Sequence, residues 1–245
     1  MNLKSYLEER ALMVDEALAV LLPEKTSYPA TIHDAMRYSI FAGGKRIRPI
    51  LCLASAEALG KEFRHLLPVA CALEMVHTYS LIHDDLPAMD NDDYRRGKLT
   101  NHKVFGEGIA ILAGDALLTK AFEVLAAYGR RVSNESVPVV LQVIQEIAHA
   151  AGTMGMIGGQ VVDLQSEGKT VDPDTLSYIH THKTGALFTA SVRAGALLSG
   201  ASDKELASLT TYAQNFGLAF QITDDLLDIV GDETKIGKPV GSDLK

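Results

Sequence analysis

The sequence predicts an all-α protein, folded as a single large helical bundle over residues 1–245. The helix-forming residues Ala, Leu, Glu and Met are abundant, aromatic residues make up only 6% of the chain, and Trp is absent. Apolar residues recur at helical spacing along most of the chain, and no segment shows a convincing strand pattern. No repeat or low-complexity linker divides the helices, and 245 residues suffice for one large domain.

The first three predicted helices have clear start and stop signals. Residues 2–22 carry apolar side chains at near-helical spacing and end before a proline. A second helix is predicted over residues 30–42, with the glycine pair 43–44 as its C-terminal cap. Pro49 opens the third, in the first turn, where a missing N–H has no consequence. This helix is expected to end near Gly60.

The middle of the chain supplies the predicted core. Residues 66–84 are almost wholly apolar, so this helix is expected to lie inside the domain. Residues 108–128 and 136–151 read as two further core helices. Residues 152–166 contain three glycines, each of which weakens a helix by about 1 kcal/mol relative to Ala. Such glycines indicate close backbone packing or the close approach of a ligand.

Two helices complete the prediction. Asp172 and Pro173 signal a helix start, and the helix over residues 175–199 is expected to be interrupted near Lys183-Thr184-Gly185. The last helix covers residues 203–230.

Composition narrows the functional classes. The formal net charge of −8 argues against non-specific nucleic-acid binding, which needs a basic face. Cys52 and Cys71 lie in apolar helical runs and are expected to be buried free thiols in a reducing cytosol. The N-terminus is charged, unlike a signal peptide, and no uninterrupted apolar run is long enough for a membrane span. These features predict a cytoplasmic location.

An acidic cluster follows the central apolar helix, within residues 74–103. Its aspartates are Asp84, Asp85, Asp90, Asp92 and Asp93, and the basic residues Arg95, Arg96, Lys98, His102 and Lys103 come next. Carboxylates this dense repel one another unless a cation neutralises them, and Mg2+ prefers oxygen ligands that it often shares with phosphates. Guanidinium groups suit phosphate as well. The alternative is a solvated charged loop, which remains the interpretation for Asp92 and Asp93.

A second acidic cluster lies in the last helix. Asp224 and Asp228 are four residues apart and therefore share a helix face, and Asp225 is adjacent. The surrounding residues are apolar, and this helix offers no Lys or Arg partner one turn away. Salt bridging at the edge of the core is the alternative. Two such clusters together favour carboxylate walls that hold metal ions and a diphosphate across a cavity.

These motifs resemble the trans-prenyl diphosphate synthases. The strongest matches are DDLPAMD (84–90) with Arg95-Arg96-Gly97 after it, and DDLLD (224–228). Further matching stretches are GGKRIRP (43–49), His77, NHKVFGE (101–107), GQVVDL (159–164), HKTGALF (182–188), FQITDDLLD (220–228) and IGKPVGSDL (236–244). The sequence looks most like bacterial farnesyl diphosphate synthases (geranyltranstransferases) and is also similar to plant-type and cyanobacterial geranylgeranyl enzymes.

The resemblance implies a fold, a partner and a reaction. The family fold is an all-α bundle around a deep central cavity, usually in a homodimer, and this chain is expected to lack the family's C-terminal helices. Isopentenyl diphosphate would condense head to tail with an allylic diphosphate (dimethylallyl or geranyl) by ionisation, condensation and elimination. Three Mg2+ ions per active site, with Mn2+ as an alternative, would stabilise the departing diphosphate. Their implied ligands are Asp84, Asp85, Asp90, Asp224, Asp225 and Asp228.

The resemblance also assigns substrate-binding residues. Isopentenyl diphosphate would contact Gly44, Lys45, Arg48, His77 and Arg96. The allylic substrate would contact Arg95, Lys183, Thr184, Gln221 and Lys238, and Lys183 counts among the catalytic residues. Alternatives remain for several of them: Lys45 and Arg48 as solvated turn residues, His77 as a satisfied core histidine, and Lys183 as a cation near a helix C-terminus.

Product length is the last expectation. Tyr79 lies five residues before Asp84, about 7.5 Å along the helix, where a bulky aromatic in this family closes the cavity. Farnesyl diphosphate is the predicted product, with geranylgeranyl diphosphate as the alternative. Ser80 is closer in azimuth to Asp84, and Tyr79 could instead pack against a neighbouring helix. The competing functions are another class I terpenoid enzyme, a regulatory subunit of a prenyl synthase, and a helical interaction module.

Overall fold

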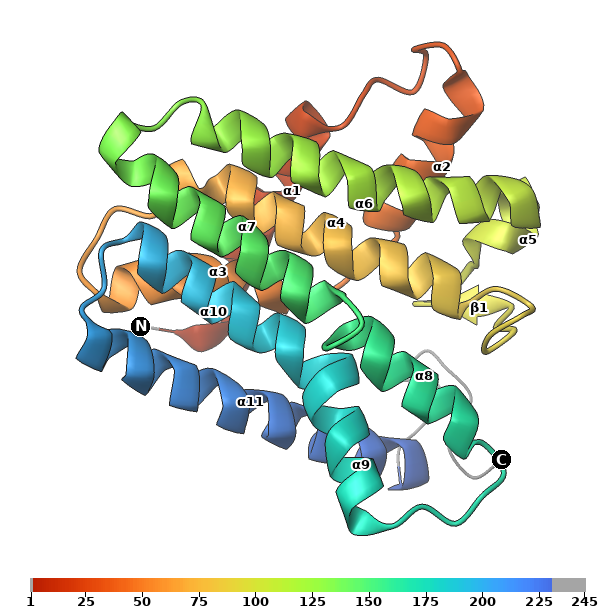
Figure 1. Cartoon of the computed structure of the whole chain (residues 1–245). Coiled ribbons are helices and arrows are strands. Elements are labelled where there is room, and N and C mark those ends of the chain that lie inside the picture. Colours follow the sequence, from red (N-terminus) through yellow and green to blue (C-terminus); the bar gives the residue numbers. More distant parts are fainter. Residues whose placement is uncertain (1, 231–245) are drawn as a thin grey trace. The chain divides into compact units, whose positions relative to one another are not determined.

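The computed structural model describes residues 2–230, and the side chains of Asp225 and of residues 227–230 are outside that description. Lys238, one of the predicted allylic-site residues, also lies outside the described residues. The chain is almost entirely helical, which confirms the predicted all-α class (Figure 1). The α-helices are α1 (Leu3–Leu21), α2 (Ala30–Ile40), α3 (Ile47–Ala58), α4 (Leu67–Asp84), α5 (Asn101–Phe105), α6 (Glu107–Gly129), α7 (Val137–Ala151), α8 (Met156–Ser166), α9 (Pro173–Ile179), α10 (Ala186–Leu198) and α11 (Asp203–Val230).

Backbone proximity divides the chain into two compact units. The first unit comprises Met1–Leu53 and Arg64–Asn134, and the second comprises Ala54–Phe63 and Glu135–Lys245. Helix α3 passes from one unit into the other. The interpretation of the chain as one domain stays a prediction.

The first unit is built on α4, which lies along α6 and also contacts α1 and α2. As predicted, α4 is buried on nearly all sides, because its residues are apolar all round. By length and composition alone, the segment Arg64–Asp84 could cross a membrane. However, 67% of its apolar 18-residue stretch is buried inside the structure, as in a core helix. Cys52 and Cys71 are buried free thiols, as predicted, and burial raises the pKa of both.

Small residues let α6 approach α4. Ala110, Ala113 and Ala121 of α6 are fully buried. At Gly114 a Cβ atom would collide with the imidazole ring of His83 in α4. The two helix axes therefore come close together at a point where a larger side chain on α6 would force them apart.

The loop between α2 and α3 departs from the prediction. Helix α2 ends at Ile40, and its C-cap is Phe41, not the glycine pair. Gly43 and Gly44 instead belong to the loop, with φ values of +104° and +132°. The expectation was wrong because a buried side chain further along the loop, Arg46, sets its path.

Arg46 holds this loop to the core. Its side chain is 1% exposed, and its Nε and Nη1 atoms contact Asp15 Oδ1 (2.7 Å) and Glu74 Oε1 (2.8 Å). Nη2 also donates to the Ile40 carbonyl oxygen (2.5 Å). The backbone of Arg46 adopts a positive φ of +50°, which is uncommon for a residue with a side chain. One guanidinium group thus joins α1, α2 and α4 to the start of α3.

The second unit packs α7 and α11 against α10. Phe188 of α10 is fully buried and meets the rings of Phe216 and Phe220 of α11 edge to face. Arg193 of α10 pairs with both carboxylate oxygens of Glu146 in α7 (2.7 and 2.8 Å). Apolar packing and one bidentate ion pair therefore hold α10 between its neighbours.

The predicted interruption near Lys183 is confirmed. Between α9 and α10 the chain forms a π-helical segment, η3 (His180–Gly185), with i→i+5 geometry. Helix α8 and helix α11 both contact this segment.

Five small elements were not anticipated from the sequence. Strands β1 (Tyr94–Arg95) and β2 (Lys98–Leu99) form an antiparallel hairpin, and α5 is a single short helix after it. Two short 3-10 turns, η1 (Arg64–Leu66) and η2 (Asn134–Ser136), precede α4 and α7. Strands of two residues are too short to produce an alternating pattern in the sequence.

Replacing Arg46 should destabilise the first unit strongly. We expect Arg46→Leu to lower the free energy of unfolding by about 3–5 kcal/mol, because Glu74 would be left buried without its ion-pair partner. Urea unfolding followed by circular dichroism measures this change. The control is Arg131→Leu, at an exposed arginine, where the change should stay within about 0.5 kcal/mol. If the two substitutions lowered the free energy of unfolding equally, the buried ion pair would contribute no more to stability than an exposed arginine does.

Candidate functional site

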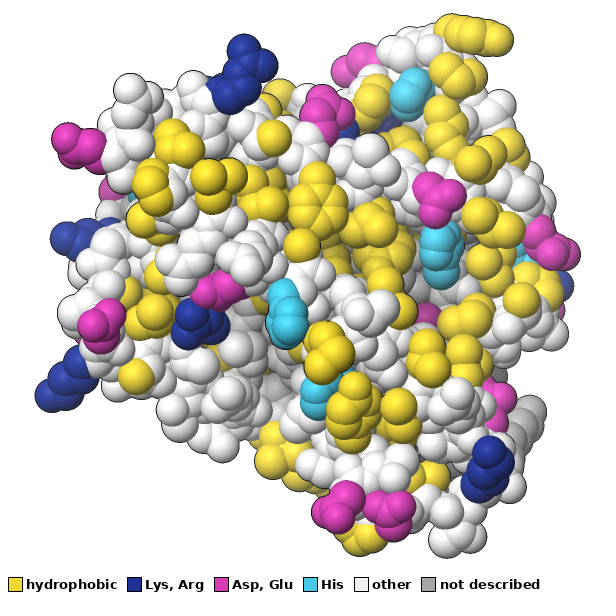
Figure 2. Space-filling view, viewed as in Figure 1, with side chains coloured by type: hydrophobic (Ala, Val, Ile, Leu, Met, Phe, Trp, Pro, Cys, Tyr) yellow, Lys and Arg dark blue, Asp and Glu magenta, His cyan; other side chains and the backbone are white. Residues whose placement is uncertain are grey.

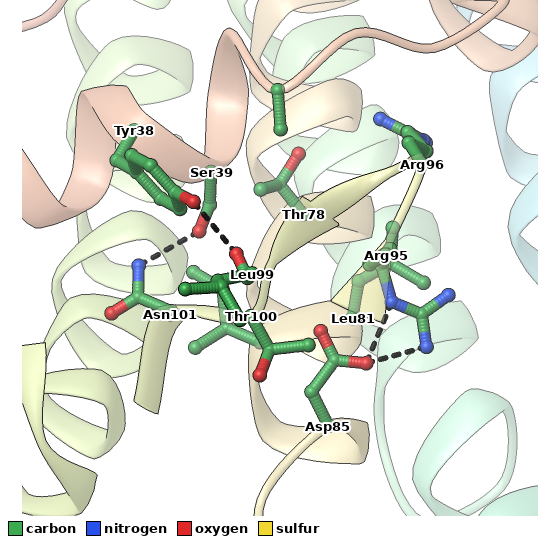
Figure 3. Close-up of a pocket in the computed structure, with 12 residues that line it drawn as sticks. Tyr38, Ser39, Thr78, Leu81, Asp85, Arg95, Arg96, Leu99, Thr100 and Asn101 are labelled. Atoms are coloured by element: carbon green, nitrogen blue, oxygen red, sulfur yellow. Dashed lines mark hydrogen bonds and ion pairs between the residues drawn. The ribbon is translucent and has the colours of Figure 1, made fainter. Parts of the chain in front are cut away.

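A tight hairpin presents two consecutive arginines in different directions. Arg95 pairs with Lys98 across the strands, so Arg96 and Gly97 form the connecting turn. Their φ values are +54° and +75°, and positive values at both central residues are those of a type I′ turn. Figure 3 shows Arg95 directed toward Asp85 and Arg96 directed away from it.

Arg95 neutralises the first aspartate motif from one side. Its Nε and Nη2 atoms both lie 2.6 Å from Asp85 Oδ1, and Nη2 lies 3.7 Å from Asp92. Asp85 is only 3% exposed. Burial raises the pKa of this carboxyl group above its usual value, although the hydrogen bond and the charge of Arg95 oppose that rise.

The remaining aspartates of this motif lie around the end of α4. Asp84 is half-buried and Asp90 is exposed. The backbone N–H of Asp90 donates to the Asp84 carbonyl oxygen (2.9 Å), so the loop returns to its own start. Asp93 pairs with Lys103 (2.8 Å), both partly exposed, in keeping with a solvated charge pair.

The described residues do not complete a metal site. Among the side chains that the structure describes, which exclude those of Asp225 and Asp228, no three His, Cys, Asp or Glu residues form a group that could hold a metal ion. In the second motif Asp224 is exposed, and the side chains of Asp225 and Asp228 lie outside the described part. The donor chemistry fits Mg2+, since all the candidates are carboxylates, and Arg95 takes the place of a cation at Asp85 in this arrangement. The predicted metal ligands stay a prediction.

A half-buried, neutral histidine marks a concentration of positive charge beside this motif. The pKa of His77 is held well below its usual value, first by burial and then by nearby guanidinium groups. Those groups belong, in decreasing order of effect, to Arg48, Arg96, Arg95 and Arg46. Arg46 and Arg95 are paired with carboxylates, whereas Arg96 is exposed, and like charges gathered this closely favour an anion beside them.

Burial also affects Arg48. It lowers the pKa of Arg48 to about 10, with Glu74 raising it and Arg96 lowering it further. Arg48 is therefore not the solvated turn residue of the alternative interpretation, whereas Lys45 is exposed. Glu74 provides the buried negative charge beneath these arginines.

Gly44 makes room for Arg96. The guanidinium of Arg96 donates from Nη1 to the carbonyl oxygen of Gly43. A Cβ atom on Gly44 would lie 2.5 Å from that same Nη1 atom, and the φ of +132° also disfavours any side chain. The sequence-predicted Gly44 and Arg96 are thus brought together by the shape of the loop.

A pocket lies between α2, α4, the hairpin and the start of α5 (Figure 3). The hydroxyl of Tyr38 donates to the Leu99 carbonyl oxygen (2.7 Å). Asn101 Nδ2 donates to Ser39 Oγ (2.8 Å) and to the Ala35 carbonyl oxygen (2.9 Å). These bonds fasten the hairpin and α5 to α2, which explains the role of the Asn that begins NHKVFGE.

The second unit assembles the remaining candidates around η3. Lys183 Nζ donates to Asp163 Oδ2 of α8 (2.5 Å). Thr184 Oγ1 donates to Gln221 Oε1 of α11 (2.9 Å), and Asp224 follows Gln221 by one turn. Lys183 is thus fixed by an ion pair, and not merely placed near a helix C-terminus.

Tyr79 faces α6. It is 6% exposed and meets the ring of His83 edge to face, with centroids 5.7 Å apart. His83 in turn lies 3.0 Å from the Ile111 carbonyl oxygen of α6. Burial, followed by the charge of Asp84, raises the pKa of Tyr79 to about 12. Ser80 donates to the His77 carbonyl oxygen (2.9 Å).

Comparison with known proteins decides the family. Residues 29–245 match the family model described as polyprenyl synthetase. The chain belongs to the polyprenyl synthetase family. It is 55% identical to a geranylgeranyl diphosphate synthase of Cyanophora paradoxa, over 100% of this chain and 80% of that protein. It is 54% identical to a farnesyl diphosphate synthase of Geobacillus stearothermophilus, over 99% and 81% of the two chains.

Solved structures of polyprenyl synthetases share the fold. An apo FPP/GFPP synthase from Zymomonas mobilis matches with a TM-score of 0.87 and 42% identity, over 94% of this chain and 82% of that chain. A geranylgeranyl pyrophosphate synthetase from Pyrococcus horikoshii gives the same TM-score at 39% identity, over 99% and 72%. The predicted family is thereby confirmed. Relatives with farnesyl and geranylgeranyl names match equally well, so family membership leaves the product open.

Sequence reasoning missed several residues whose contacts hold the candidate site of this polyprenyl synthetase in place. They are Asp15, Tyr38, Arg46, Glu74, Asn101 and Asp163. Arg46, Asn101 and Asp163 fall inside stretches that match the family. That position was their only sequence signal, because their partners come from distant helices.

The neutral state of His77 predicts a pH effect on stability. Its folded pKa is depressed, so below about pH 6.5 the unfolded chain binds a proton that the folded chain does not. Stability is therefore lost as pH falls from this value toward the folded pKa. We expect His77→Gln to reduce that loss, measured by urea unfolding between pH 7.5 and 5.5. His149→Gln, at an exposed imidazole, is the control, and an unchanged pH slope in His77→Gln would contradict the depressed pKa.

Proposed function

We propose that this chain is a Mg2+-dependent prenyltransferase that makes farnesyl diphosphate from isopentenyl diphosphate and an allylic primer. The observation that carries the proposal is the group of guanidinium ions beside the first aspartate motif, where Arg95 contacts Asp85 and exposed Arg96 is held at the Gly43 carbonyl oxygen. Guanidinium groups suit an anion with several oxygens, such as a diphosphate. Membership of the polyprenyl synthetase family agrees with this ligand.

Residues of the first unit would bind isopentenyl diphosphate. Arg48 and Arg96 would take the diphosphate oxygens, and exposed Lys45 could add a third cation. Arg96 lies on the hairpin turn and donates to the Gly43 carbonyl oxygen, a bond that it can exchange for one to a phosphate oxygen. An anion beside His77 would favour its protonated form, in which both ring nitrogens are hydrogen-bond donors.

The allylic diphosphate would be bound by Arg95, Lys183, Thr184, Gln221 and Lys238. When bound to the aspartates of the two motifs, Mg2+ supplies Lewis-acid stabilisation of the leaving diphosphate. The allylic C–O bond breaks with its electron pair leaving on diphosphate, and the double bond of isopentenyl diphosphate attacks the resulting cation. A proton is then lost to the released diphosphate, which restores a double bond. Fixed cations such as Lys183 stabilise the charge that develops during ionisation.

Incubation with isopentenyl diphosphate, Mg2+ and each primer (C5, C10 or C15) tests this proposal. We expect condensation with the C5 and C10 primers, a product that stops at C15, and loss of activity when a chelator removes the metal. Chromatography of the dephosphorylated products measures chain length. A C20 product would favour the geranylgeranyl alternative. The absence of turnover with every primer would contradict the proposed enzymatic activity and would favour a regulatory subunit.

Tyr79 offers a test of product length. If its ring limits the growing chain, Tyr79→Ala should shift the main product from C15 to C20 or longer, because removing the ring opens space beside α4. Tyr79→Phe keeps the ring and should leave the product unchanged. The contact of Tyr79 with His83 on the α6 side supports the opposing interpretation, in which Tyr79 only packs between helices. An unchanged C15 product from Tyr79→Ala would establish that interpretation.

We also propose a cytoplasmic homodimer. Apolar side chains of α5 and α6 are exposed by 43% at Val104, 44% at Ile111 and 54% at Leu112. Figure 2 shows exposed hydrophobic side chains scattered over the face on which α6 lies. Exposed apolar groups on adjacent turns are suited to a protein partner, and the mass in solution tests the proposed dimer.

A further inference from the structure

Helices α8 and α11 approach the π-helical segment η3 in the same way. Each brings a glycine against the backbone of η3. At Gly159 of α8, a Cβ atom would collide with the backbone of Lys183, at 2.7 Å from its Cα atom. At Gly217 of α11, a Cβ atom would lie 3.1 Å from the Cα atom of Gly185. Gly159 therefore requires a residue without a side chain, and at Gly217 a Cβ atom would be tighter than most real contacts.

Each helix then offers a polar side chain four residues later. Residues i and i+4 share a helix face, so Asp163 follows Gly159 on the face toward η3, and Gln221 follows Gly217 in the same manner. Asp163 accepts a hydrogen bond from Lys183 Nζ (2.5 Å). Gln221 accepts one from Thr184 Oγ1 (2.9 Å). The glycine sets the distance between backbones, and the polar residue binds a side chain of η3.

The segment η3 has i→i+5 geometry, and such turns are frequent at functional sites. Within it, Lys183 bonds to α8 while Thr184 bonds to α11. Without partners on both sides, the long side chain of Lys183 would sample many rotamers.

We infer that Asp163 is a positioning residue, which orients the ammonium group of Lys183 for the allylic diphosphate. The side chains of Lys183 and Asp163 are 27% and 39% exposed. This exposure leaves the ion pair accessible to an incoming anion. The carboxylate of Asp163 would repel a diphosphate directly. Any favourable effect of Asp163 on diphosphate binding therefore comes through its contact with Lys183. The inference rests on the proposed function, because Lys183 has been assigned to the allylic substrate. It accounts for the GQVVDL stretch, which the proposed reaction leaves without a role.

Asp163→Asn tests the inference by keeping the shape of the side chain and removing its charge. We expect the KM for geranyl diphosphate to rise about tenfold, the effect of one charge-assisted hydrogen bond, with the KM for isopentenyl diphosphate changed less than twofold. Calorimetric affinity for an unreactive geranyl thiodiphosphate should fall by the same factor. Asp163→Glu keeps the charge and displaces it by one methylene, so its KM for geranyl diphosphate should lie between those of the wild type and Asp163→Asn.

Asp174→Asn is the matched control, because it removes the same charge from an exposed position of the same unit. It should leave both KM values unchanged. Gly159→Ala should reproduce the selective rise in the KM for geranyl diphosphate, and Gly108→Ala, where a Cβ meets nothing within 4 Å, should not. If Asp163→Asn does not fold, Asp163→Glu and Gly159→Ala still carry the comparison.

The outcomes separate this inference from the proposed function. A wild-type chain that condenses no primer overturns the proposed function. An active wild type, together with an Asp163→Asn chain whose two KM values are unchanged or rise equally, overturns the inference. A rise confined to geranyl diphosphate that Asp163→Glu partly reverses supports the positioning role.

Discussion

The buried ion pair between Arg46 and Glu74 is the contact on which the first unit depends. It joins the loop before α3 to the middle of α4, and almost no solvent reaches either side chain. Burial of two charges is favourable only when each is closely paired, and Arg46 meets that condition with Glu74, Asp15 and a backbone carbonyl oxygen. The chain direction set there places Gly43 and Gly44 under Arg96. The buried Arg46–Glu74 pair thus holds the loop to which the exposed guanidinium of Arg96 bonds.

The same negative charge also steadies the surrounding arginines. Burial lowers the pKa of Arg48 and of Arg96, and the charge of Glu74 opposes that fall. Burial and the nearby arginines together depress the pKa of His77. The unit therefore gathers several guanidinium groups around a neutral imidazole through its own contacts. Under the proposed function, these charges would not have to be gathered when a diphosphate arrives. The opposite situation holds at Asp85, where Arg95 supplies the positive charge that a metal ion would otherwise provide.

Glycines admit a neighbouring group at several points of the structure. Gly114 accommodates His83, Gly44 accommodates Arg96, and Gly159 accommodates the backbone of Lys183. In each case the missing side chain admits a neighbouring group to a position that packing then fixes. Three glycines in residues 152–166 had indicated either close packing or a ligand, and Gly159 shows close packing next to a residue assigned to substrate.

The sequence by itself determined the helical class, most helix limits, the break near Lys183 and the family. Each of these is encoded locally, by apolar spacing, by start and stop residues, or by short motifs such as DDLPAMD. Only the tertiary structure decided which motif residues gather at the candidate site and which hold the protein together. Within GGKRIRP, Arg46 turns inward and Arg48 joins the cluster around His77, although both are arginines two residues apart. Within GQVVDL, Asp163 gains a role only because η3, about twenty residues later, brings Lys183 beside it. Partners from distant helices leave no local pattern, so that distinction depends on the folded chain.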